Sequence, residues 1–281
     1  MTSAGHHVMM SGKAAPPAPA YWGLCFTAEE PNVVVNMAKF GSPSAVTLET
    51  STDGVTWTTF DADGGTTPIT LAAIGDHVFF RAGAGGNTRI CETSQRHRRF
   101  SFSGRVSASG SIQSLLDGST PTVTMDTSVN GTFRQLFSGC SSLTSAPELP
   151  ATTLANSCYY SMFAECDSLV DAPNLPATTA SQYCYEYMFD HCSLLEKGPE
   201  IALTTLATAC CLAMFIDCQN LKWLQVANSG WTTSTGSNAF SNWVSGVAAT
   251  GTFRCPTALG TNATITRGDS NCPVGWTVVN V

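Results

Sequence analysis

Charge is scarce in this chain: Asp, Glu, Lys and Arg make up 12% of its 281 residues, about half the usual share. Basic residues are the scarcer sign, with 13 Lys and Arg against 20 Asp and Glu and a formal net charge of −7. Such a chain gains nothing from counterion release on DNA, so we expect no nucleic-acid partner. Long apolar runs are lacking too. Since none approaches the ~20 residues of a membrane helix, we expect no membrane span.

The sequence also lacks the short motifs of nucleotide-binding and hydrolytic enzymes, because no P-loop, G-x-G-x-x-G or G-x-S-x-G occurs. Its five histidines fall in no catalytic or metal-binding pattern. The segment STDGVTW at 51–57 is similar to the Asp-box hairpin of sialidase-like propellers, but it is one residue short and occurs once. That hairpin is structural in those propellers. We therefore expect no enzyme, no catalytic residue, no metal and no cofactor, with a sialidase-class enzyme as a remote alternative.

The chain is rich in internal repetition, with a period of 26 residues. Several columns of one residue type recur in a single register: Phe137, Phe163, Phe189 and Phe215; Cys140, Cys166, Cys192 and Cys218; Leu143, Leu169, Leu195 and Leu221; Pro147, Pro173 and Pro199; Cys158, Cys184 and Cys210. Chance does not align so many columns. A stack of short repeated units, a solenoid, is the expected architecture.

One unit runs from Ala151 to Pro176 and divides into two parts. Leu154, Cys158, Met162 and Cys166 are four residues apart, which predicts one apolar stripe of a short helix. The segment LVDAPNLP at 169–176 contains two prolines and predicts an extended rung. Helices pack ~8–10 Å apart, whereas strands pair at ~4.8 Å. This mismatch predicts a curved solenoid with the rungs on its concave side.

The repeat pattern C-Y-x-x-M-F-x-x-C-x-x-L-x-x-A-P-x-L-P resembles the BspA-like leucine-rich repeats found in gut bacteria and their phages. It covers roughly residues 131–226 in three clear copies and a degraded fourth. In the fourth copy Cys210-Cys211 replaces Cys-Tyr, and KWLQVAN at 222–228 lacks the A-P-x-L-P rung. The resemblance implies a location on a cell surface or virion and adhesion-type binding. It identifies no ligand.

The fold class that follows is α+β: an N-terminal antiparallel β domain, then a short leucine-rich-repeat-type solenoid with a helix and a strand per repeat, and caps. We expect a flexible arm at 1–20, where prolines interrupt the apolar residues. Short β-type runs predict a sandwich-like domain at 21–104, with an Asp-Gly hairpin turn at 53–54. The solenoid with its N-terminal cap takes 105–226, and a C-terminal cap takes 227–281.

Twelve cysteines raise the question of metal ions and disulfides. A zinc site needs paired C-x₂₋₄-C knuckles, whereas the recurring spacings here are 18 and 8. The repeat cysteines are therefore interpreted as small buried apolar residues. A disulfide between Cys255 and Cys272 stays open. A secreted scaffold held by disulfides is less favoured, because packing rather than pairing sets the columns.

Charge divides the chain in two. Six arginines lie between 81 and 105, whereas 137–221 holds nine acidic residues and one base, Lys197. Arg96, Arg98 and Arg99 are a candidate docking patch for an acidic neighbour. The alternative is a solvated hairpin.

Some repeat positions vary while their neighbours stay constant, and such positions must face outward. They lie on the extended rung, so we expect them on the concave face, where solenoids usually bind. Mere solvation of that face is the alternative. The candidate binding residues are Thr144, Ser145, Glu148, Val170, Asp171, Asn174, Glu196, Lys197 and Glu200.

The function expected is that of a non-enzymatic phage virion protein, a head or tail fibre or decoration module that displays a recognition surface. A bacterial cell-surface BspA-like adhesin is the alternative. The first 20 residues show no export signal, which favours release by lysis within a phage particle. Expected partners are other virion proteins or a host-surface protein or glycan. Multi-copy display predicts a homo-oligomer, most plausibly a trimer.

Overall fold

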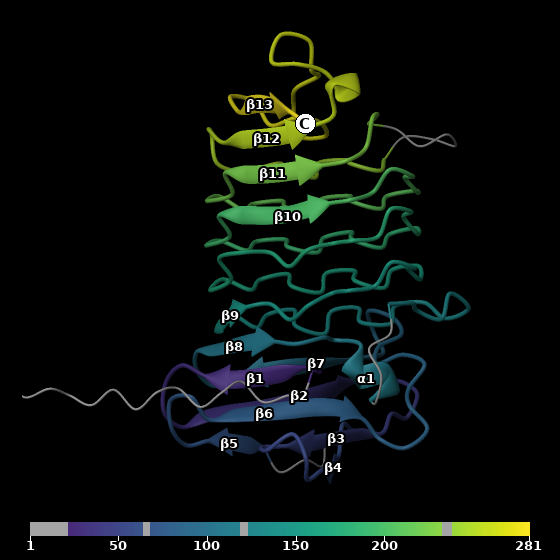
Figure 1. The fold of residues 1–281 in the computed structure, drawn as a ribbon, viewed down its shortest axis with the longest axis vertical. Coiled ribbons are helices and arrows are strands. Elements are labelled where there is room, and N and C mark those ends of the chain that lie inside the picture. The colour runs from purple at the N-terminus through teal and green to yellow at the C-terminus, as the bar shows by residue number, and fades with distance from the viewer. Residues whose placement is uncertain (1–21, 64–67, 119–122, 232–237) are drawn as a thin grey trace, which may run out of the picture.

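The computed structural model describes residues 22–63, 68–118, 123–231 and 238–281. It shows an antiparallel β-sheet domain with a β-solenoid stacked on it (Figure 1). Both parts were predicted, and the region proposed as a flexible arm, 1–20, lies outside the described residues. The predicted repeat helices are wrong. In the described residues, regular helix is confined to α1 (Ser114–Asp117) and the 3₁₀ turn η1 (Thr257–Leu259).

The N-terminal domain consists of two sheets packed through aromatic side chains. Its strands are β1 (Cys25–Ala28), β2 (Val33–Phe40), β3 (Leu48–Ser51), β4 (Thr58–Phe60), β5 (Ile69–Leu71), β6 (His77–Ala82), β7 (His97–Phe102) and β8 (Val106–Ser109). One sheet has the order β5-β2-β7. The other runs β4-β3-β6-β1-β8-β9, in which β9 (Leu143–Ser145) comes from the solenoid. Phe26 of β1 contacts Phe100 and Phe102 of β7 edge-on, with ring centroids 4.9 and 5.0 Å apart. These contacts fill the space between the sheets.

The predicted Asp-Gly hairpin is confirmed between β3 and β4, which pair antiparallel from Leu48↔Phe60 to Thr50↔Thr58. The Asp53 carboxylate holds the loop, because it accepts the backbone N–H groups of Val55 and Thr56 at 2.8 and 2.7 Å. Those backbone hydrogen bonds, that of Thr56 first, lower the pKa of Asp53 below its usual range. The carboxylate of the Asp-box-like segment is thus occupied in building its own turn.

The strands of the solenoid are parallel and add to one another along its length. They are β9 (Leu143–Ser145), β10 (Lys197–Ile201), β11 (Trp223–Val226), β12 (Thr252–Cys255) and β13 (Thr277–Asn280). β10 to β13 form one sheet in that order, and single bridges such as Asp171↔Lys197 continue the pairing to the preceding coil. Coils therefore continue beyond residue 226, into the segment predicted to be only a cap.

Four-residue turns occupy the place of the predicted helices. In the central coils every fourth residue has a left-handed backbone: Ser157, Ser161 and Glu165 in one coil, then Tyr183, Tyr187 and His191 in the next, with φ between 48° and 61°. An α-helix cannot pass through such residues. The repeated turn nevertheless preserves the i, i+4 spacing that was interpreted as a helical stripe.

Backbone hydrogen bonding explains why these turns form. Successive N–H groups alternate: Cys158 donates within its own coil to Ala155, Tyr159 donates to Cys184 of the next coil, Tyr160 donates to Ser157, and Ser161 donates to Glu186. Half of the donors thus bind along the solenoid axis, which an isolated helix never does. These bonds offset the ~1–3 kcal/mol that a left-handed residue other than glycine costs.

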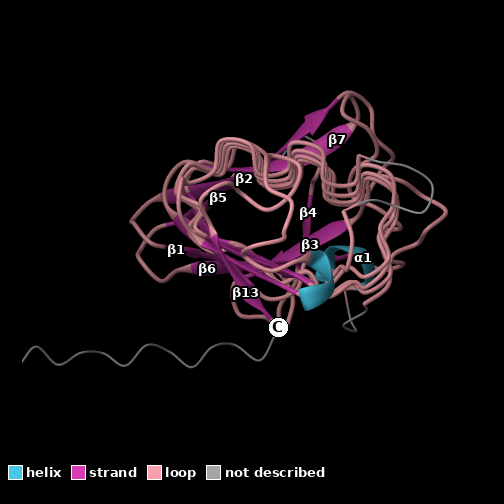
Figure 2. Cartoon of the chain, turned by 90° about the horizontal axis from the view of Figure 1, so that it is seen from above, coloured by secondary structure: helices cyan, strands magenta, loops and turns pink. Residues whose placement is uncertain are grey.

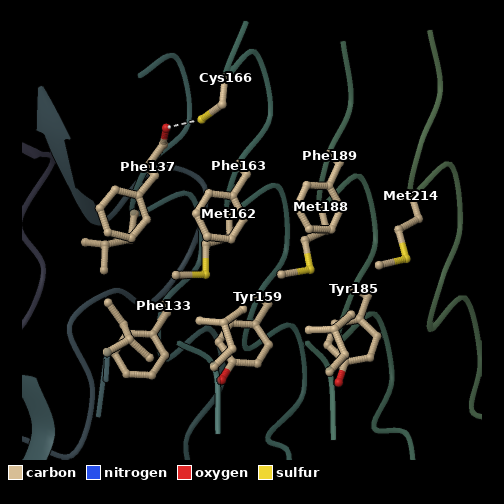
Figure 3. Close-up of a cluster of buried hydrophobic side chains, with 14 of the residues drawn as sticks. Phe133, Phe137, Tyr159, Met162, Phe163, Cys166, Tyr185, Met188, Phe189 and Met214 are labelled. Carbon is tan, nitrogen blue, oxygen red and sulfur yellow. Dashed lines mark hydrogen bonds between the residues drawn. The ribbon is translucent and has the colours of Figure 1, made fainter. Parts of the chain in front are cut away.

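The columns of identical side chains are the core. Phe163 and Phe189 are fully buried, as predicted, and the rings of Phe137, Phe163, Phe189 and Phe215 stack with centroids 5.4–5.5 Å apart (Figure 3 shows the first three). Turn segments this close match strands at ~4.8 Å. The mismatch that was to curve the solenoid is therefore absent, and the coils lie one above another (Figures 1 and 2). The expectation of a concave face loses its physical basis.

The repeat cysteines lie buried in line and are free thiols, as predicted. Three of them point to a backbone carbonyl of an earlier coil: the Sγ atoms of Cys166, Cys192 and Cys218 lie 3.2, 3.0 and 2.9 Å from the carbonyl oxygens of Phe137, Phe163 and Phe189 (Figure 3 shows the first). Burial raises the pKa of these thiols, so they remain protonated donors. Cys255 and Cys272 are also free and buried.

The N-terminal domain covers the first coil of the solenoid. The ring of Phe100 in β7 stacks on Phe137 at 5.5 Å, and its carbonyl accepts the Cys140 thiol at 3.0 Å. β8 pairs antiparallel with β1 and parallel with β9, so one sheet crosses the proposed 104/105 boundary. The domain thereby supplies the neighbour that the first coil requires.

Candidate functional site

The predicted binding residues lie on one side of the stack, which we call the strand face. It comprises the outward side chains of β9 to β13 and of residues 170–174, together with Glu148, Glu196 and Lys222. Val170, Asp171, Asn174, Glu148, Glu196, Lys197 and Glu200 are exposed, and Thr144 and Ser145 are half-buried. The variable positions thus reach the surface. Their role in binding stays a prediction.

The first coil contributes least to an accessible surface. The Thr144 hydroxyl lies 2.7 Å from the Glu29 carboxylate, and the Ser145 hydroxyl donates to the Ala108 carbonyl at 2.8 Å. Both hydroxyls are thus engaged by the N-terminal domain. Apart from the exposed Glu148, the accessible part of the strand face begins with the next coil.

Strand register arranges the later coils in two outward rows. Lys197 pairs with Trp223, and Trp223 pairs with Thr252. The second row has Glu200 beside Gln225 and Gln225 beside Arg254. Between the rows the intervening residues, such as Leu224 and Phe253, are fully buried, which fixes the outward direction of both rows.

In the sequence Trp223 shares the variable column of Ser145, Asp171 and Lys197, but it was left out of the candidate residues because the fourth copy was interpreted as a cap. Gln225, Thr252 and Arg254 were missed, because the fourth copy is degraded and the chain after residue 226 was assigned to a cap. The alternation of TFRC at 252–255, with Phe253 and Cys255 apolar, was the available signal of a strand. Two contacts organise this region. The Lys197 ammonium lies 5.1 Å from the Trp223 ring centroid, and Lys222 pairs with Glu196 at 2.7 Å.

The proposed docking patch of arginines is wrong for Arg98, whose side chain is buried. Its guanidinium donates to the carbonyls of Ala62, Ile90 and Ser44 at 2.9–3.2 Å and pairs with Asp63. It therefore stabilises the domain interior.

Its neighbours are also engaged. Arg99 donates to the Ser138 carbonyl at 3.1 Å and lies over the Phe40 ring, and Arg96, which is exposed, pairs with Glu92 at 3.4 Å. The side chains of the arginine cluster thus mostly form contacts within the domain.

An acidic groove of about 420 Å³ lies over the turn segments and is lined by Glu165, Asp167, Asp190, His191, Ser193, Asp217 and Gln219. His191 binds Asp190 and lies 3.4 Å from Asp217, and the hydrogen bond to Asp190 raises its pKa. No group of three or more His, Cys, Asp or Glu side chains in the described ranges is placed to hold a metal ion. Nor does any helix among those residues have the length and apolar character to cross a membrane.

Comparisons of the chain with protein-family models, with curated proteins and with solved structures find no match.

Proposed function

We propose that this protein is a non-enzymatic binding module that displays the strand face on a rigid solenoid, as a structural or fibre protein of a phage particle. The observation that carries the proposal is the contrast between the two sides of the rung. Inward positions stay apolar from coil to coil, as in Leu175, Ile201 and Val226, whereas the outward row changes from Asp171 to Lys197 to Trp223. A recognition surface needs this combination of a constant core and free outward positions.

The resemblance of the repeats to BspA-like proteins supports display on a particle or a cell. A bacterial surface adhesin remains the second candidate, because the same resemblance favours it equally. In either setting many copies would compensate for modest affinity per subunit, because linked sites add avidity without new contacts. We therefore propose a homo-oligomer, with a trimer as the most plausible form.

The test labels the intact protein fluorescently and measures its retention on purified phage particles and on bacterial cells. The matched variant replaces Asp171, Lys197, Glu200 and Arg254 with Ser. We expect the wild type to be retained and the variant to be lost, while light scattering shows the same oligomer for both. Equal retention of both proteins would refute a role for the strand face, and antibody detection in virions or in cell-wall fractions separates the two candidates.

A further inference from the structure

We infer that the strand face binds an oligosaccharide, with the Trp223 ring as the stacking platform and Gln225, Arg254 and Glu200 as its hydrogen-bonding partners. This inference rests on the proposed function and names the chemistry of its ligand.

Trp223 differs from the tryptophans that build the core. Trp243 and Trp276 are fully buried and donate their indole N–H groups to backbone carbonyls, at 2.8 Å to Asn271 and 2.7 Å to Ala248. Trp223 is half-buried on the outward side of β11, and its indole N–H donates to no residue in the described part of the chain. Packing alone does not explain a tryptophan here, because the buried residues of β11 are Leu224 and Val226.

In the part of the chain that the structure describes, the polar groups beside the ring also lack protein partners. Among the described residues, the Glu200 carboxylate, the Gln225 amide and the Arg254 guanidinium form no side-chain hydrogen bond or ion pair. By contrast, Glu196 and Lys222 on the same face neutralise each other.

These groups match both the apolar face and the polar hydroxyls of a sugar. The C–H face of a pyranose ring is apolar and packs on an indole ring, whose flat surface carries partial negative charge. The hydroxyls at its rim both donate and accept. They match the Gln225 amide, two residues along β11 from Trp223, and the Glu200 carboxylate and Arg254 guanidinium on the two strands that flank Gln225 at ~4.8 Å. The Lys197 ammonium lies over one face of the indole, 5.1 Å from the ring centroid, so the sugar would stack on the other face.

Other ligand classes fit less well. A stable protein partner requires an apolar, desolvated centre, yet the other large apolar side chains exposed along this face in the described coils are Val170 and Val279, which lie in coils far apart. Nucleic acid would require a basic surface, and here Lys197 and Arg254 are balanced by Asp171 and Glu200. The open strand face suits an extended chain of sugars rather than a single enclosed one.

The experiment uses the intact protein labelled with 5-fluorotryptophan, in which the resonance of Trp223 is assigned by its absence from Trp223→Ala. An immobilised panel of neutral and acidic oligosaccharides built from hexose, N-acetylhexosamine, uronic acid and sialic acid units selects the probe. The best-binding oligosaccharide is then titrated while the ¹⁹F resonances are followed. We expect the Trp223 resonance to shift and those of Trp243 and Trp276 to stay.

Affinity in the variants gives the second readout. Trp223→Ala should weaken binding by ~30-fold or more, the effect of losing a central aromatic contact, and Arg254→Ala by about tenfold, the loss of one good polar contact. Trp223→Phe, which keeps a ring but lacks the N–H, should fall between Trp223→Ala and the wild type. Tyr183→Ala is the control, because Tyr183 is an aromatic side chain exposed by 39% in a turn segment. It should leave affinity unchanged within about twofold.

Failure to observe a shift at Trp223 with any panel member at millimolar concentration would overturn the inference. Equal affinity of the wild type and Trp223→Ala would do the same. If no sugar binds although the strand-face variant loses retention on particles or cells, the proposed function survives and the ligand is of another class. If sugars bind through Trp223 but retention does not depend on the strand face, the proposed function falls and the sugar site stands.

Discussion

Replacement of Phe189 by alanine tests the central feature of the molecule, the column of stacked rings. Phe189 is fully buried and contacts Phe163 and Phe215, with centroids 5.5 and 5.4 Å away and planes within 8° of parallel. Removing a buried Phe side chain costs ~3–5 kcal/mol, since transfer and cavity terms add. Two ring contacts at about 0.5–1.5 kcal/mol each place this residue in the upper half of that range. We expect the free energy of unfolding to fall by about 4–5 kcal/mol.

Urea unfolding of the intact protein, followed by far-UV circular dichroism and by tryptophan fluorescence, gives the measurement. Both probes are needed because a stack of coils can unfold from one end, and coincident transitions justify one free energy. Phe189→Leu retains an apolar side chain and isolates the ring contacts, so it should cost about 1–3 kcal/mol. Leu194→Ala is the matched control in the same coil. Leu194 is 50% exposed, and its removal should change stability by less than about 0.5 kcal/mol.

If Phe189→Ala lowers the free energy of unfolding by less than about 1 kcal/mol, or by no more than Leu194→Ala does, then the Phe189 ring does not stabilise the core, and the stacked column is refuted. A normal loss of stability in Phe189→Ala together with an equal loss in Phe189→Leu would refute only the contribution of ring stacking.

Three further predictions concern buried polar groups. Burial raises the pKa of the Cys140 thiol to about 12 and raises the pKa of its counterparts. We therefore expect Cys140, Cys166, Cys192 and Cys218 to resist alkylation at pH 8 in the native protein and to react fully, without reductant, after denaturation. Mass spectrometry measures the labelling, and recovery of any of the four in a disulfide would contradict this. Arg98→Met should cost about 3–5 kcal/mol, because Asp63 and the three carbonyls lose their partner, whereas Arg96→Met should cost less than about 0.5 kcal/mol; equal losses in urea unfolding would refute the assignment. Burial raises the pKa of Glu92, but hydrogen bonds from Ser44 and the charges of Arg89 and Arg96 outweigh it and lower the pKa below 4.5. The contribution of Glu92 to the free energy of unfolding is therefore present above its pKa in the unfolded chain and is lost as the pH falls through its pKa in the folded protein. The wild type should thus lose more stability than Glu92→Gln between about pH 5 and pH 3. Parallel profiles of stability against pH for the two proteins would contradict this.

Periodicity in the sequence predicted the solenoid, its 26-residue coils and the burial of the Phe, Cys and Leu columns, because each column must contact its own copies. It predicted the wrong local structure between the strands. Spacing by four fits an α-helix and a chain of four-residue turns equally well. The distinguishing signal was faint: Gly131 and Gly139 occupy, one repeat earlier, the left-handed positions of Ser157 and Glu165. In the central coils these positions hold Ser, Tyr, Glu and His, which do not reveal the turn.

For a related reason, only part of the candidate site could be predicted. Variation at a constant period identifies outward positions, and it found Asp171, Lys197 and Glu200. This approach fails where the period changes. The coil of Trp243 follows the coil of Phe215 after 28 residues rather than 26, since the Phe215 N–H donates to the Trp243 carbonyl. Arg254 was therefore not recognised, whereas Trp223 shares the column of Asp171 and Lys197 and was left out because the fourth copy was interpreted as a cap. The predicted docking patch was wrong for Arg98, because a run of basic residues does not show which side chain is buried. The Arg98 guanidinium donates to carbonyl groups that are distant in the sequence.

The two ends of the stack constrain how many copies of the strand face can be assembled. The outer edge of β13 is covered by side chains: Asn262 both donates to the Val278 carbonyl at 3.1 Å and accepts its N–H at 2.7 Å, as a paired strand would. Arg267 donates to the Trp276 carbonyl at 2.9 Å. An edge satisfied in this way cannot recruit the strand of another molecule. The other end of the solenoid is covered by the N-terminal domain. Multi-copy display, which the proposed function requires, must therefore come from contacts of that domain or along the sides of the column, and it leaves the strand face free only if the oligomer forms away from Trp223.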